Sequence, residues 1–163
     1  VSIPAPDGVA CVKVQTAEEM LAACEAALPA DIAVCTAAVS DWRASVPAGS
    51  KIKKTGDGPP TLSLVENPDI LATLCRHASR PKLVVGFAAE TDDVLENALA
   101  KRQRKGCDWL VANDVRRGVF GADRNFVSLI DGNGIEEWPE MDKSAVAGKL
   151  AERISKTFES STT

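Results

Sequence analysis

The chain has 163 residues, of which 45% are hydrophobic and 26% are charged, as is ordinary for one domain with its own core. The formal net charge of −4 offers no basic field for nucleic acid. No stretch is apolar for long enough to cross a bilayer, and the opening residues do not form a signal peptide. We therefore expect a cytoplasmic protein with no nucleic-acid or membrane partner.

The cysteines and the single histidine exclude several kinds of site. The five cysteines form no CxxC pair, and an odd number in apolar or helical settings favours free, buried thiols in a reducing compartment. His77 is the only histidine, so the sequence has few of the histidines that a zinc site or a Ser/His triad uses. The sequence assigns no metal ligands.

The first half of the chain predicts two strands and a helix. Residues 9–14 read as a short strand. Thr16 is a plausible N-cap with Glu19 as its capping-box partner, and the helix should run to about Leu28. Residues 32–39 are continuously apolar, which is typical of a buried parallel strand.

The middle of the chain predicts a long loop, then a short strand and a helix. Residues 40–60 are rich in Gly, Pro, Ser and Lys, and residues 61–65 alternate like a strand of a projecting arm. A helix should follow, with Asn67 as its cap, Pro68 in its first turn and Asp69 complementing its dipole.

The second half alternates strands and helices. We expect strands over residues 82–88 and 108–112, a helix over 94–105 that ends at Gly106, and a closing helix over 143–158. Between the strand over residues 108–112 and the closing helix lie residues 126–130 and 135–138, which flank an Asp-Gly-Asn-Gly turn and predict a hairpin. Residues 160–163 should fray.

This order predicts an α/β fold with a Rossmann-like, doubly wound and mostly parallel sheet, to which the hairpin adds antiparallel strands at one edge. We expect one domain over residues 1–163, with a loop or arm at 44–66.

Ligands of open α/β sheets bind at the carboxyl ends of the strands. That rule selects residues 35–43, 51–54, 67–71 and 86–91. In the first segment small alanines allow a flat ligand to approach, and Asp41 supplies an acceptor; the alternative is a simple turn aspartate. In the second, clustered lysines suit a polyphosphate, although they also fit a solvated charge run.

The remaining segments are equally open to two interpretations. The helix start at residues 67–71 offers free N–H groups to an anion, as any helix start does. Phe87 is either a base-stacking residue or a core residue. Lys101 and Lys105 share one helix face and either meet phosphates or are solvated.

The joint order of these motifs is more specific than any one of them. The chain carries AAVSDWR, KIKK, NPDIL, VGFAAET, a Lys-x3-Lys helix and VAND in succession. From about Cys35 to the hairpin it closely resembles the phosphopantothenoylcysteine synthetase half of the bifunctional flavoprotein of coenzyme A biosynthesis.

The resemblance implies a phosphopantothenate–cysteine ligase that uses CTP and Mg²⁺. Such enzymes activate 4′-phosphopantothenate as an acyl-cytidylate, and the cysteine amine then displaces CMP. Lys51 matches the catalytic lysine, and residues 51–65 match the arm through which members form homodimers. The implied nucleotide-binding residues are Cys35, Thr36, Ala37, Asp41, Lys51, Pro68, Asp69, Ile70, Leu71, Phe87, Lys101 and Lys105.

The sequence departs from the family at its start. Family synthetase domains begin with a βαβ segment that carries a Gly/Ser-rich loop and an Asn used in handling the acyl-cytidylate, and this sequence starts after it. We therefore expect this chain to be incomplete for the whole reaction. Nothing in it resembles the decarboxylase half, which is the part that uses FMN.

Two other functions stay open. The first is a nicotinamide-dependent Rossmann oxidoreductase. Such an enzyme is expected to carry a GxGxxG motif after its first strand, and this sequence has no such motif. The second is a domain that binds a nucleotide or forms a dimer but has lost catalytic turnover.

Overall fold

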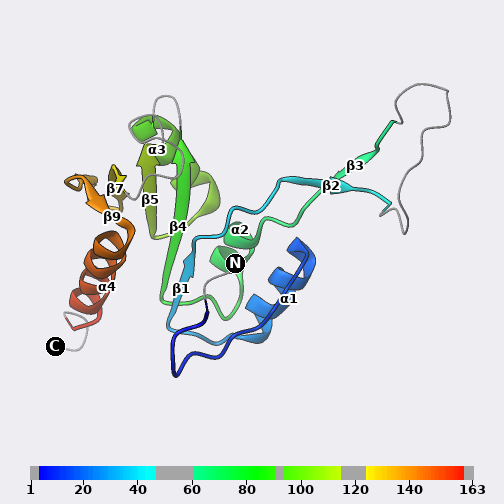
Figure 1. The fold of residues 1–163 in the computed structure, drawn as a ribbon, viewed down its shortest axis with the longest axis horizontal. Helices are drawn as coiled ribbons and strands as arrows, with labels where there is room; N and C mark the ends of the chain where they lie inside the picture. The colour runs from blue at the N-terminus through cyan, green and yellow to red at the C-terminus, as the bar shows by residue number, and fades with distance from the viewer. Residues whose placement is uncertain (1–3, 47–60, 91–93, 115–123, 160–163) are drawn as a thin grey trace.

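The computed structural model describes residues 4–46, 61–90, 94–114 and 124–159 (Figure 1). In these ranges the helices are α1 (Ala17–Ala26), α2 (Ile70–Arg76), α3 (Val94–Lys105) and α4 (Lys143–Glu159). The strands are β1 (Ile32–Cys35), β2 (Trp42–Ala44), β3 (Leu64–Glu66), β4 (Leu83–Glu90), β5 (Trp109–Asp114), β6 (Arg124–Asn125), β7 (Val127–Ile130), β8 (Ile135–Glu137) and β9 (Met141–Asp142).

The main sheet is mixed rather than mostly parallel. Its strand order is β1-β4-β5-β7-β8. The β1–β4 and β4–β5 pairings are parallel, whereas β5–β7 and β7–β8 are antiparallel. The prediction of an α/β fold with a closing hairpin is confirmed, but the mostly parallel sheet is wrong. The hairpin makes up two of the five strands, because β7 pairs directly with β5 along four residues.

The core lies on both faces of this sheet. On β4, Val84 and Ala88 face the cluster that includes Ala98 of α3, whereas Val85 faces the cluster that includes Leu150 of α4. Figure 1 shows α4 on one side of the sheet, with α1 and α2 on the other side. Successive residues of a strand point to opposite faces, so β4 separates two packed layers.

Several local predictions are confirmed. Thr16 caps α1, with its Oγ1 accepting from Glu19 N at 3.1 Å and the Glu19 carboxylate accepting from Thr16 N at 3.3 Å. Helix α3 has the predicted bounds, and Gly106 follows it with a φ of +76°. These features depend on residues within one turn of each other, which is why the sequence specifies them.

The first predicted strands differ from the structure. Residues 9–14 form no strand, and the side chains of Val9 and Val12 are 59% and 70% exposed. The strand predicted over residues 32–39 ends at Cys35, and it is exposed or half-buried rather than buried. Among the described residues, β1 lies at the edge of the sheet and pairs only with β4, so its apolar side chains lack the neighbours that a central strand has.

The arm and the following helix also differ in detail. The predicted strand over residues 61–65 is instead Leu64–Glu66, and it pairs antiparallel with β2, which lies in a stretch expected to be irregular. Asp69 rather than Asn67 caps α2, accepting from Ala72 N at 3.0 Å. Asn67 is not available as a cap because its side chain bonds to Ser40 and Arg43.

Some predictions fall outside the described residues. They concern Lys51 and the rest of the KIKK segment, the arm between residues 51 and 60, Thr91, and the fraying of residues 160–163. The assignment of residues 1–163 to one domain stays a prediction as well.

Two glycines should respond in opposite directions to the same substitution. A Cβ at Gly86 would lie 2.6 Å from Leu71 Cδ2 and 3.0 Å from Leu110 Cδ1, so Gly86→Ala should lower the free energy of unfolding by about 1–2 kcal/mol. At Gly148, on the exposed side of α4, a Cβ meets nothing within 4 Å. Gly148→Ala should raise stability by about 0.5–1 kcal/mol. Denaturant unfolding measures both, and equal shifts would contradict the close packing of α2 on β4.

Candidate functional site

The ends of β1 and β4 bring the first predicted residues together. Cys35 pairs with Gly86, and β4 continues to Glu90 after β1 has ended. Thr36 and Ala37 follow β1 directly and are exposed, as is Asp41. Among the described residues, no hydrogen bond or ion pair involves the Asp41 carboxylate, so it is available to a ligand.

Asp69 and Lys105 meet across α2 and α3. Asp69 Oδ2 accepts a hydrogen bond from Lys105 Nζ, while Oδ1 accepts from Ala72 N. Partial burial would raise the pKa of Asp69, but the Lys105 hydrogen bond and the Ala72 N–H outweigh it, and the pKa is lowered. Asp69 is therefore ionised at neutral pH and fixes the Lys105 ammonium, whose side chain is 18% exposed.

The segments after β1 and before α2 are joined by Asn67. Its backbone N–H donates to Asp41 O and its Nδ2 donates to Ser40 O, each at 2.8 Å. Arg43 Nη1 donates to Glu66 O at 2.5 Å and to Asn67 Oδ1 at 3.4 Å. Arg43 Nε lies 2.6 Å from Glu18 Oε1 of α1.

An open groove lies beside this junction, between α1 and the base of the β2–β3 arm. Its volume is about 530 Å³. The lining residues come from α1, the arm and the segment before α2: Glu18, Leu21, Ala22, Glu25, Arg43, Glu66, Asn67 and Pro68.

The other predicted site residues lie in different surroundings. Ile70 is buried, and Leu71 is half-buried above Gly86, so both help to pack α2 on the sheet. Lys101 is half-buried on α3, one turn before Lys105.

Phe87 lies on the other face of the sheet. It is half-buried and packs against the cluster under α4, whereas Gly86 and Ala88 face α2 and α3. The structure thus brings Asp69 and Lys105 together and leaves the Phe87 ring on the opposite side. This favours the core interpretation of Phe87.

Burial disfavours ionisation of the Cys35 and Cys75 thiols. Burial, with smaller contributions from other cysteines, raises the pKa of Cys35 to about 11, and burial likewise raises that of Cys75 to about 11. Both thiols are protonated at neutral pH. All five cysteines are free, as predicted; Cys75 and Cys107 are buried, but Cys11 is exposed, so the expectation of buried thiols holds only in part.

The described residues contain no metal site and no membrane span. No group of three His, Cys, Asp or Glu side chains in these ranges could hold an ion. None of the helices described combines the length and the apolar composition that crossing a membrane requires.

Residues 1–158 match the family model of the DNA/pantothenate metabolism flavoprotein C-terminal domain. The chain belongs to this family. The resemblance found in the order of the sequence motifs is thereby confirmed at the level of the family.

Curated proteins that are similar to this chain agree with this assignment. The Coenzyme A biosynthesis bifunctional protein CoaBC of Mycobacterium tuberculosis is 40% identical over 161 residues, covering 91% of this chain and 38% of that protein. The protein of the same name from Escherichia coli is 40% identical over 155 residues, covering 92% of this chain and 38% of that protein. The chain thus spans about two-fifths of the length of these relatives.

Solved structures share the family fold. The crystal structure of the C-terminal domain of Coenzyme A biosynthesis bifunctional protein CoaBC has a TM-score of 0.73 and 30% identity, covering 98% of this chain and 73% of that chain. A Cab2 mutant in complex with phosphopantothenate-cysteine has a TM-score of 0.56 and 20% identity, covering 77% of this chain and 44% of that chain. The second likeness concerns the fold alone.

The sequence did not reveal the contacts of Arg43 and Asn67. Asn67 was expected to cap a helix, and Arg43 had no assigned role. Their contacts join positions 24 and 27 residues apart in the sequence, so no short-range pattern signals them. The only available signal was the Asn-Pro pair, which is ordinary at a helix start.

Proposed function

We propose that this chain is the nucleotide-binding part of a phosphopantothenate–cysteine ligase of coenzyme A biosynthesis. The reaction joins 4′-phosphopantothenate to L-cysteine through an acyl-cytidylate, with CTP as the nucleotide and magnesium as the partner of its phosphates. Family membership and the names of the curated relatives support the reaction. The complex of Cab2 with phosphopantothenate-cysteine is consistent with it.

The pairing of Asp69 with Lys105 is the structural observation that carries the proposal. It fixes an ammonium group close to the start of α2, and the remaining N–H groups of that ammonium can donate hydrogen bonds to phosphate oxygens. Lys101 is the second cation on this helix, and Asp41 offers a free acceptor after β1. Lys51, from outside the described residues, is proposed to neutralise the charge that develops on the attacked α-phosphate.

The other proposed contacts are less direct. Cys35, Thr36 and Ala37 line the end of β1, where their small side chains leave the backbone open to a base or ribose. Pro68, Ile70 and Leu71 shape the start of α2. Phe87 contributes through its backbone, since its ring packs beneath α4.

The proposed test measures pyrophosphate release. A protein that contains this chain should release pyrophosphate from CTP only when 4′-phosphopantothenate is present, because the carboxylate is the attacking group. Binding of CTP without any release would favour a remnant that has lost turnover. Binding of NADPH without binding of CTP would favour the oxidoreductase.

We also propose that the arm mediates a homodimer. The side chains of Trp42, Leu62 and Leu64 are 53%, 62% and 55% exposed on the described part of the arm. Such an apolar surface on a projecting hairpin is typical of a contact with another protein. A second copy of the chain is the proposed occupant.

Light scattering tests the dimer. The chain should have about twice its monomer mass of 17.2 kDa, and Leu64→Lys should convert it to a monomer, because a buried lysine without a partner opposes association. The matched control is Ile135→Lys on β8, which is 40% exposed and lies outside the arm. A monomeric unmodified chain at high concentration would contradict the proposal.

A further inference from the structure

We propose that Asn67 is a positioning residue, oriented by Arg43, that sets the distance between the two halves of the nucleotide site. One half follows β1 and carries Thr36, Ala37 and Asp41. The other is the start of α2, whose cap holds Lys105. The inference rests on the proposed function, which it deepens by naming residues outside the predicted nucleotide-binding set.

Asn67 makes hydrogen bonds from both its backbone and its side chain to the same short segment. The backbone N–H donates to Asp41 O and Nδ2 donates to Ser40 O, each at 2.8 Å. Two bonds to adjacent carbonyl groups fix both the separation and the orientation of that segment. Because Asp69 is only two residues further on, movement of residues 40 and 41 is coupled directly to the start of α2.

Arg43 determines which way the Asn67 amide faces. Its guanidinium donates to Asn67 Oδ1 at 3.4 Å and to Glu66 O, so the Asn67 oxygen points to Arg43 and the nitrogen to Ser40. The ion pair with Glu18 anchors Arg43 to α1. A carbonyl oxygen cannot take the place of Nδ2 here, because Ser40 O requires a donor.

The segment between β1 and β2 is held at its two ends by strand pairing, because Cys35 pairs with Gly86 of β4 and Trp42 pairs with Glu66 of β3. Residues 36–40 have no regular secondary structure, and residues 36–42 are exposed. Asn67 makes the described hydrogen bonds between this segment and the stretch that joins β3 to α2. Without the Asn67 side chain, the backbone at Ser40 would lose its donor and the segment that carries Asp41 would be fixed less well relative to Lys105, so a ligand that contacts both would bind more weakly.

The experiment compares Asn67→Ala with Thr157→Ala in the 163-residue chain. Thr157 is the matched control because its Oγ1 also donates to a backbone oxygen, that of Arg153 in α4, on the other side of the sheet. Calorimetry with magnesium CTP gives the dissociation constant, and thermal unfolding gives the stability of each variant. Asn67→Asp is the second variant, since it keeps the shape of the side chain but replaces the donor to Ser40 by an acceptor.

Asn67→Ala removes the bonds to Ser40 and Arg43, and Asn67→Asp places an acceptor against Ser40 O while it keeps the acceptor for Arg43. We expect each variant to weaken CTP binding by about tenfold or more. Thr157→Ala should leave the dissociation constant unchanged. Hydrogen exchange should show faster exchange at the Asn67 amide and in residues 36–41 of the Asn67 variants only. A purely structural role would lower the melting temperature without this change in affinity.

The outcomes separate the two proposals. If the unmodified chain binds CTP and the Asn67 variants bind equally well, the positioning role is overturned and the proposed function stands. If the unmodified chain binds no CTP, the proposed function fails and the positioning role fails with it. If the Thr157 variant loses as much affinity as the Asn67 variants, the effect is general destabilisation, which also overturns the positioning role.

Discussion

Lys51→Ala should lower the rate of acyl-cytidylate formation on the order of a hundredfold to a thousandfold, as removal of one charge-stabilising group typically does. Lys51 is proposed to neutralise negative charge that develops only in the transition state. The loss should therefore appear in kcat, with a smaller change in KM for CTP. Pyrophosphate release, measured in whichever length of the protein shows ligase turnover, reports the rate.

The matched control lies in the same short segment. Lys54→Ala removes the same charge from the KIKK run, and it should retain most of the activity if Lys51 has a specific role. Equal losses in both variants would show that the run acts only through its total charge. Near-normal pyrophosphate release by folded Lys51→Ala would contradict the assignment.

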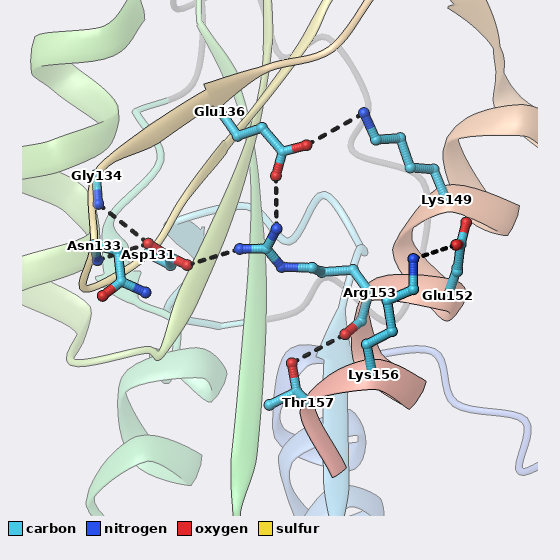
Figure 2. Close-up of polar contacts among 9 residues, drawn as sticks. All are labelled: Asp131, Asn133, Gly134, Glu136, Lys149, Glu152, Arg153, Lys156 and Thr157. Atoms are coloured by element: carbon cyan, nitrogen blue, oxygen red, sulfur yellow. Dashed lines mark hydrogen bonds and ion pairs between the residues drawn. The ribbon is translucent and has the colours of Figure 1, made fainter. Parts of the chain in front are cut away.

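Arg153→Ala should lower the free energy of unfolding by about 2–3 kcal/mol, through loss of the contact between α4 and the hairpin. Figure 2 shows Arg153 between two carboxylates of the hairpin, at 2.9 Å from Glu136 Oε2 and 3.2 Å from Asp131 Oδ2. The Asp131 side chain is only 11% exposed, so without Arg153 its charge would be left poorly solvated. The guanidinium also lies 5.8 Å from the centre of the Trp109 ring, which adds packing that alanine lacks.

The contact between Arg153 and Asp131 matters for the hairpin because Asp131 also binds the backbone of the turn. Its Oδ1 accepts from the backbone N–H groups of Asn133 and Gly134 at 2.7 and 3.2 Å, which shapes the turn between β7 and β8. Arg153 therefore orients the carboxylate that organises the turn.

Lys82→Ala is the control for Arg153→Ala. Lys82 pairs with Asp31 at 2.9 Å, but both side chains are more than 70% exposed, so the loss should stay within about 1 kcal/mol. Denaturant unfolding compares the two variants. Equal losses would contradict the view that the contact of α4 with the hairpin stabilises the fold.

The sequence was sufficient where neighbouring residues decide the structure. The capping box of Thr16 and Glu19, the end of α3 at Gly106 and the turn after Asp131 each depend on groups within a few residues. The hydrophobic pattern also identified β4, β5, β7 and β8 within about two residues of their observed bounds, but it predicted a strand over residues 9–14 that does not form. It was not sufficient for residues 32–39, because an apolar run does not reveal how many neighbours a strand has.

The candidate site was predictable only in its parts. The segments after the strands were identified because ligands meet the carboxyl ends of parallel strands. The side of the sheet to which Phe87 points depends on the register between β4 and β5, which the sequence pattern did not give. The contacts of Asn67 depend on the pairing of β2 with β3, across about twenty residues of chain.

A calorimetric titration of the chain with CTP and with ATP, each with magnesium, tests the nucleotide site most directly. We predict saturable binding of CTP, at least about tenfold tighter than that of ATP, as the resemblance to CTP-dependent ligases implies. Asp41→Asn should weaken the binding of CTP, because its free carboxylate is proposed to contact the nucleotide. Equal affinity for the two nucleotides, or no binding of CTP, would contradict the account.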